Sequence, residues 1–174
     1  MTTMYVSKDI EPVTLYMKKD PIFEEKGPIP SFGITLGMSE QQIISIMKRQ
    51  GLTLFEENYK ETNGRIEGDF LFCGKAEVYG MEITAVKITV SLFDVEHCYY
   101  FFDEEADFRS RLPAPDAKWY QVGELEGIYN HLRQSLKNEF GDPVDQKDWW
   151  KIDSTYYSLF NGSETDHMVF LSVF

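Results

Sequence analysis

Leu36-Gly37-Met38-Ser39-Glu40-Gln41-Gln42-Ile43 is the stretch that decides how the fold begins, because it specifies the start of a helix. The Ser39 hydroxyl can accept a hydrogen bond from one of the first free backbone N–H groups, and the Gln42 side chain can reach back to the backbone of Ser39. This reciprocal pair is a capping box. Gly51 has the position at which glycine commonly ends helices. The pattern predicts a helix over residues 39–50.

A second amphipathic helix is predicted in the last third of the chain. Apolar residues recur there at spacings of three and four, as on the buried face of a helix: Leu125, Tyr129, Leu132, Leu136 and Phe140. Gly141 and Pro143 follow them, and they form a helix stop of the same kind as Gly51.

Segments with the composition of β-strands follow each helix. They are residues 70–72, 83–93 and 98–102 after the first helix, and residues 149–152, 155–160 and 168–174 after the second. This order predicts an α+β protein. We expect two helix-then-strands units that form a mostly antiparallel sheet, with both helices on one face.

The chain is expected to consist of a short arm and one compact domain. Residues 1–30 contain four prolines among mixed charges and are interpreted as an N-terminal arm. Residues 31–174 are interpreted as a single compact domain. Because each helix ends on glycine before the chain enters a sheet, this domain has the pattern of a structural duplication, with units at residues 31–110 and 118–174.

The composition is that of an acidic globular protein. Hydrophobic residues make up 43% of the chain and aromatic residues 15%, which is enough for a large aromatic core. The net charge of -12 disfavours nucleic acids and anionic membranes, both of which attract clustered Lys and Arg. The apolar runs are too short to span a bilayer, and the first residues have no signal-peptide pattern. We therefore expect a soluble cytoplasmic protein that does not insert into membranes.

Several short motifs resemble those of known bacterial proteins. Phe32-Gly33-Ile34, followed by Leu36-Gly37-Met38-Ser39 and a helix, resembles the opening of the small outer-membrane assembly lipoproteins and of other proteins with the β-lactamase-inhibitor-protein-like fold. Gly68-Asp69-Phe70, Trp119-Tyr120 and Phe140-Gly141-Asp142-Pro143 also resemble a group of uncharacterised bacterial proteins.

This resemblance covers residues 31–144. It implies a tandem α+β scaffold that binds other proteins and carries no catalytic machinery. The sequence differs from the assembly lipoproteins in having neither a signal peptide nor a lipid-acceptor Cys near its start.

The common catalytic and metal-binding motifs do not occur in the sequence. It contains no Gly-rich phosphate loop, no Gly-x-Ser-x-Gly and no His-Glu-x-x-His. We therefore predict no catalytic residues, no metal site and no cofactor. Cys73 and Cys98 are interpreted as small buried hydrophobic residues of a reducing compartment, with one disulfide between them as the alternative.

The most acidic segment follows the strand predicted at residues 98–102, and it is the first candidate for binding a partner: Asp103, Glu104, Glu105 and Asp107. A contact surface for a basic protein is one interpretation, and a solvated loop is the other. The segment begins like a calcium loop, but Phe108 occupies the place where such a loop needs glycine.

Trp149 and Trp150 are the second candidate for binding a partner. Neighbouring residues of a strand point to opposite faces of the sheet, so one ring is expected to face the core and the other to face outward. An outward ring could anchor another protein, unless a helix or the N-terminal arm covers it.

Together these features lead us to expect a noncatalytic protein-binding or scaffold protein of unknown partner. One alternative is an acidic inhibitor or immunity-type protein that masks a basic protein. The other alternative is a small-ligand-binding domain, or an enzyme, that uses a cleft between the helices and the sheet.

Overall fold

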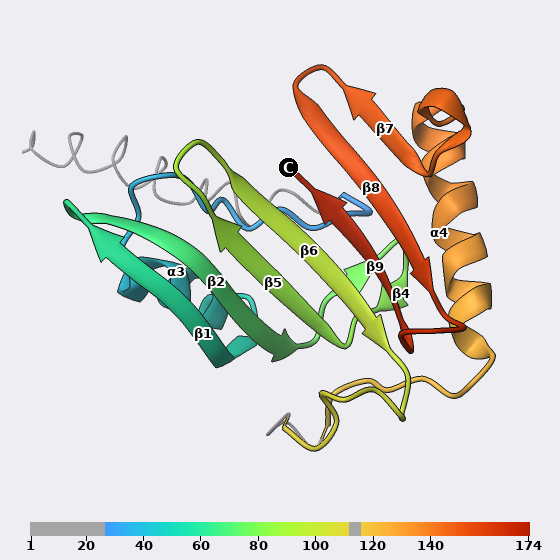
Figure 1. Cartoon of the computed structure of the whole chain (residues 1–174), viewed down its shortest axis with the longest axis horizontal. Helices are drawn as coiled ribbons and strands as arrows, with labels where there is room; N and C mark the ends of the chain where they lie inside the picture. Colours follow the sequence, from blue (N-terminus) through green and yellow to red (C-terminus); the bar gives the residue numbers. More distant parts are fainter. Residues whose placement is uncertain (1–26, 112–115) are drawn as a thin grey trace, which may run out of the picture.

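The computed structural model describes residues 27–111 and 116–174. Residues 1–26, which form most of the predicted arm, lie outside the described residues. The described chain contains two α-helices and a seven-stranded sheet in which neighbouring strands are all antiparallel (Figure 1). The prediction of an α+β protein with a mostly antiparallel sheet is therefore confirmed.

Both predicted helices are present. Helix α3 covers Glu40–Arg49 and begins with the predicted capping box, in which the backbone N–H of Gln42 donates to Ser39 Oγ at 3.2 Å. The backbone N–H of Ser39 donates in return to Gln42 Oε1 at 2.8 Å. Helix α4 covers Glu124–Phe140, and Gly141 follows it with a φ of 90°.

The strands form a large sheet and one small hairpin, β3–β4. In the large sheet their order is β1-β2-β5-β6-β9-β8-β7. The strand bounds are β1 Leu52–Thr62, β2 Arg65–Gly74, β3 Glu77–Val78, β4 Met81–Glu82, β5 Ala85–Val90, β6 Val95–Phe102, β7 Trp149–Ile152, β8 Thr155–Gly162 and β9 Met168–Val173. A short 3-10 helix, η1 (Val144–Gln146), precedes β7.

No strand is predicted from the sequence between residues 52 and 62, where the structure has the edge strand β1. The alternation of apolar and polar residues that marks a strand is lost there for two reasons. The register of β1 against β2 shifts between Leu54 and Glu56, so one extra residue in β1 interrupts the period of two. Most of its remaining side chains are exposed, as is common at the edge of a sheet.

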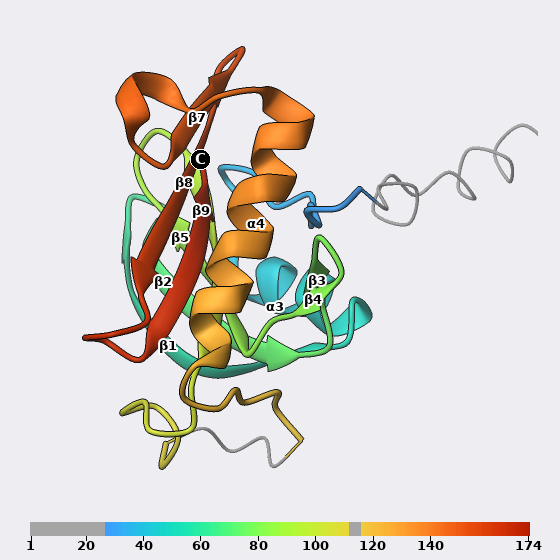
Figure 2. The same cartoon turned by 90° about the vertical axis from the view of Figure 1, so that its right-hand side faces the viewer.

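The side chains of the sheet alternate between two opposite faces. One face, here called the core face, contributes alternate residues such as Phe70, Ile88 and Phe101 to a hydrophobic cluster. Buried residues of α3 and α4, including Met47 and Leu132, belong to the same cluster. Figure 2 shows the sheet turned by 90°, with α4 running along it. The residues between these positions point to the opposite face, here called the groove face.

Candidate functional site

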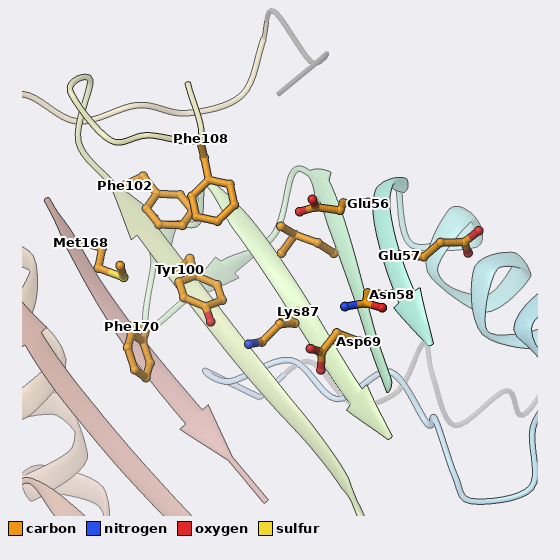
Figure 3. A pocket seen from close by; sticks show the side chains of 11 residues that line it. Glu56, Glu57, Asn58, Asp69, Lys87, Tyr100, Phe102, Phe108, Met168 and Phe170 are labelled. Atoms are coloured by element: carbon orange, nitrogen blue, oxygen red, sulfur yellow. The ribbon is translucent and has the colours of Figure 1, made fainter. Parts of the chain in front are cut away.

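A groove of about 440 Å³ lies on the groove face, above β1, β2, β5, β6 and β9 (Figure 3). Strand alternation explains which side chains line it. Phe70 and Phe72 of β2 belong to the core cluster, so Asp69 and Leu71 point to the other side and reach the groove.

Aromatic side chains form one wall of the groove and continue beyond it. The Tyr100 and Phe170 rings, on the paired strands β6 and β9, have centroids 5.3 Å apart. Phe170 in turn stacks on Phe160 of β8 at 4.8 Å. We call these three residues the aromatic row. Tyr100 and Phe170 are half-buried and Phe160 is exposed, with 39% of its surface accessible, so the row is open to contact.

Phe102 and Phe108 close the groove at the end of β6. Their ring centroids are 5.0 Å apart, and Phe102 also stacks on Tyr100 at 5.2 Å. The Arg111 guanidinium lies 4.5 Å from the centroid of Phe108, and its Nη2 contacts both Glu56 carboxylate oxygens at 3.0 and 3.1 Å. This ion pair links the segment after β6 to the edge strand β1.

Charged groups border the aromatic row at the start of β6. The register places Asp69, Thr89 and Glu96 side by side on β2, β5 and β6. The Thr89 hydroxyl donates to Asp69 Oδ1 at 2.8 Å, which fixes that carboxylate. Lys87 lies on β5 two residues before Thr89, and its Nζ is 5.8 Å from the centroid of the Tyr100 ring. Figure 3 shows Lys87 and Asp69 next to each other on the floor of the groove.

The predicted acidic segment lies just beyond the other end of β6, and one of its four residues is not at the surface. Asp103 is only 2% exposed. Its Oδ1 accepts a hydrogen bond from the backbone N–H of Glu105 at 2.6 Å, and its Oδ2 lies 3.4 Å from His167 Nδ1. Both interpretations of the segment, a contact surface and a solvated loop, require exposed side chains, and this is wrong for Asp103, whose carboxylate bonds within the turn after β6.

The other three predicted acids, Glu104, Glu105 and Asp107, are exposed. They precede Phe108, which lines the groove. Exposed acidic side chains therefore follow the end of β6, whereas Asp69 and Glu96 lie near its start.

The tryptophan pair is divided between the two faces, as a strand requires. Trp150 is 1% exposed, and its Nε1–H donates to the carbonyl of Gly141 at 2.8 Å. Trp149 is half-buried and stacks on Tyr156 of β8 with centroids 5.8 Å apart. Because Trp149 pairs with Ser158 and Ser158 pairs with Ser172, alternation places its ring on the groove face.

The cysteines are both free and buried. They lie on β2 and β6, which β5 separates, so they are not on neighbouring strands. Burial raises the pKa of Cys73 to about 12 and that of Cys98 to about 11. Both are therefore thiols at neutral pH, and a thiol is a poor nucleophile.

Metal-ligand geometry is not found in the described part of the chain. No group of three or more His, Cys, Asp or Glu side chains is close enough there to hold an ion. Among residues 27–111 and 116–174, no helix is long and apolar enough to cross a membrane.

Tyr100, Phe160, Phe170, Lys87 and Asp69 are not among the candidates predicted from the sequence, although they dominate the groove face. The sequence does hold a signal for part of the set, since Tyr100 and Phe102 lie two residues apart in a predicted strand and therefore share a face. That pattern indicates a shared face, but it does not say whether the face is covered. Whether this face is covered depends on where the other helices and strands lie.

Comparisons with known proteins gave no match. No protein-family model, curated protein or solved structure matches this chain.

Proposed function

We propose that this chain is a noncatalytic protein-binding protein and that its groove face contacts the partner. The aromatic row carries this proposal, because half-buried and exposed rings continue from the groove onto β8. Contiguous exposed apolar surface of this kind marks interaction sites in soluble proteins. Aromatic residues are also over-represented among the few residues that supply most of the energy at interfaces.

The stacking of these rings favours rigid recognition. Each ring of the aromatic row packs against a ring of the neighbouring strand. The ring centroids are 5.3 Å apart for Tyr100 and Phe170 and 4.8 Å apart for Phe170 and Phe160. Burial raises the pKa of Tyr100, so its hydroxyl stays neutral and can form hydrogen bonds with a partner. Little side-chain freedom remains to be lost on binding, which improves affinity.

The charges around the aromatic row favour a basic partner. Asp69 and Glu96 lie on one side of it, and Glu104, Glu105 and Asp107 lie beyond the other end of β6. The whole chain carries a net charge of -12. We therefore infer that the partner presents an apolar side chain surrounded by Lys or Arg. Such an arrangement places the apolar anchor at the centre and attracts the partner from a distance.

We also infer that the scaffold consists of two related units, with both helices on the core face. The strand order supports this, because β1, β2 and β5 lie on one side of the central β6–β9 pair and β8 and β7 lie on the other. Each side is preceded by a helix that ends next to a glycine with positive φ, Gly51 or Gly141. The resemblance to β-lactamase-inhibitor-protein-like proteins likewise implies a tandem α+β scaffold.

Affinity capture with matched variants tests the binding surface. The full chain is immobilised as wild type, as Phe160→Ala and as Phe93→Ala, and host lysate is passed over each. Phe93 is 85% exposed on the β5–β6 turn, which makes it a matched control outside the groove. We expect a protein captured by wild type and by Phe93→Ala to be reduced at least about tenfold by Phe160→Ala, the loss typical of an interface anchor.

A fourth bait tests the charge of the partner. It combines Glu104→Gln, Glu105→Gln and Asp107→Asn, and we expect it to capture the same protein more slowly at low salt. The difference should shrink at high salt, where charges are screened. Equal capture by wild type and Phe160→Ala would overturn the groove face as the binding surface. A partner without clustered Lys or Arg would overturn its proposed chemistry.

A further inference from the structure

The floor of the groove carries two opposite charges that form no ion pair with each other. Asp69 of β2 and Lys87 of β5 are diagonal neighbours, because Asp69 pairs with Thr89, two residues beyond Lys87. Both charged side chains are half-buried and line the groove (Figure 3). Among the described residues, no carboxylate oxygen lies within 4.0 Å of Lys87 Nζ. The groove therefore holds an ammonium group without an ion-pair partner in the described part of the chain.

Each of the two charges has a different neighbour. Asp69 Oδ1 accepts a hydrogen bond from the Thr89 hydroxyl at 2.8 Å. Lys87 Nζ lies over the ring of Tyr100, 5.8 Å from its centroid. The second carboxylate oxygen can accept further hydrogen bonds, and an ammonium group donates several, so both groups can still bind a ligand. A molecule with a negative and a positive group close together can contact both side chains at once.

The rest of the groove favours a ligand with an aromatic ring. Tyr100, Phe108 and Phe170 line it, and each of them is half-buried, so part of each ring is accessible. Aromatic rings attract one another in offset and edge-to-face arrangements. The volume of about 440 Å³ lies within the ~300–1,000 Å³ range of small-molecule sites.

The charges of the chain restrict the ligand further. An anion without a positive group would be repelled by the net charge of -12. A cation without a negative group would meet the unpaired ammonium of Lys87. A zwitterion has no net charge and can satisfy both Asp69 and Lys87. An aromatic α-amino acid has these properties, because its ammonium and carboxylate are attached to one carbon atom and its side chain is a ring.

We propose that the groove binds an aromatic α-amino acid whose carboxylate contacts Lys87 Nζ, whose ammonium contacts Asp69 and whose ring lies against Tyr100 and Phe108. This inference goes beyond the proposed protein contact and does not rest on it. The ligand would cover part of Tyr100, a member of the aromatic row. Its binding would therefore compete with that of the protein partner.

Titration of the purified full chain with three small molecules tests the site. L-Phenylalanine carries both charges, phenethylamine lacks the carboxylate and 3-phenylpropionate lacks the ammonium. We expect L-phenylalanine to bind saturably at one site per chain, at least about tenfold more tightly than either of the others, because each of them loses one charge-assisted hydrogen bond. The titration needs no protein partner, so its result is independent of the capture experiment.

Two variants assign each charge of the ligand to its side chain. Lys87→Met should weaken L-phenylalanine and 3-phenylpropionate about tenfold, and it should not weaken phenethylamine. Asp69→Asn should weaken L-phenylalanine and phenethylamine about tenfold, and it should not weaken 3-phenylpropionate. Lys147→Met, at an exposed position outside the groove, is the matched control and should change none of the three affinities.

NMR of the wild-type protein locates the ligand without a variant. The methyl resonances of Leu71 and Met168, which line the groove, should shift on addition of L-phenylalanine. Those of Leu132, which belongs to the core cluster, should stay in place. Absence of saturable L-phenylalanine binding would overturn the proposal. So would equal affinity for L-phenylalanine and phenethylamine, an equal loss of all three molecules in folded Lys87→Met, or a complex in which the Leu71 and Met168 resonances do not move.

Discussion

His97 stands on β6 opposite Ile88 and Val173, two uncharged neighbours, and burial lowers the pKa of its imidazole from 6.5 to about 4. An unfolded chain therefore binds a proton at pH 5 that the folded chain does not bind. Stability must fall as the pH drops from about 6.5 towards 4, and this group causes no further loss below that range. We expect the free energy of unfolding to decrease by about 2 kcal/mol between pH 7 and pH 5 from this residue alone.

Urea unfolding at pH 7, 6 and 5 measures this effect. His97→Phe should have a flatter pH dependence than wild type, because phenylalanine binds no proton in either state. His131→Phe, in which His97 is retained, should follow wild type. Parallel pH profiles for wild type and His97→Phe would mean that the folded imidazole titrates normally.

Single residues were predictable from the sequence only where the cause is local. The division of Trp149 and Trp150 between two faces follows from strand geometry alone, and the structure agrees with it. The burial of Asp103 has no such local cause. It depends on Tyr120 and His167, which are distant in sequence and bond to the backbone around Asp103.

At the scale of single elements, the Ser39 cap should make a measurable contribution to stability. Its hydroxyl accepts the Gln42 N–H at 3.2 Å at the start of α3, so Ser39→Ala leaves that donor without its partner. We expect a loss of about 1 kcal/mol. Ser45→Ala, at an exposed position within α3, is the matched control and should be neutral or slightly stabilising, since alanine favours helix. Equal effects in thermal unfolding would mean that the cap does not matter.

Elements were predictable where their signals lie within a few neighbouring residues. The caps and glycine stops of α3 and α4 are of this kind, and both helices are confirmed. β1 could not be found in this way, because most side chains of this edge strand are exposed and the bulge at Leu54–Glu56 breaks the alternation of apolar and polar residues. The groove face was missed for a related reason, since its rings come together only through pairing of β6, β8 and β9.

The molecule as a whole should unfold as one unit. Both helices contribute to a single core cluster, in which Leu132 of α4 is fully buried. Leu132→Ala should therefore cost about 2–5 kcal/mol. The loss should appear equally in tryptophan fluorescence and in far-ultraviolet circular dichroism, with one transition.

Leu92→Ala, at a residue that is 51% exposed, controls for the substitution itself and should change stability by less than about 0.5 kcal/mol. Two separate transitions in Leu132→Ala would mean that the two predicted units are stable independently. An unchanged midpoint would mean that α4 does not hold the core.

The place of β9 in the sheet also affects how the protein is made. β9 pairs with β6 on one side and β8 on the other, so residues 168–173 join two groups of strands that are otherwise unconnected by backbone hydrogen bonds. During translation β6 is made well before β9 exists. β6 then has an open edge next to exposed rings, which is a structure prone to aggregation. Slow synthesis through residues 103–167 should therefore increase the need for chaperones, whereas delays earlier in the chain should not.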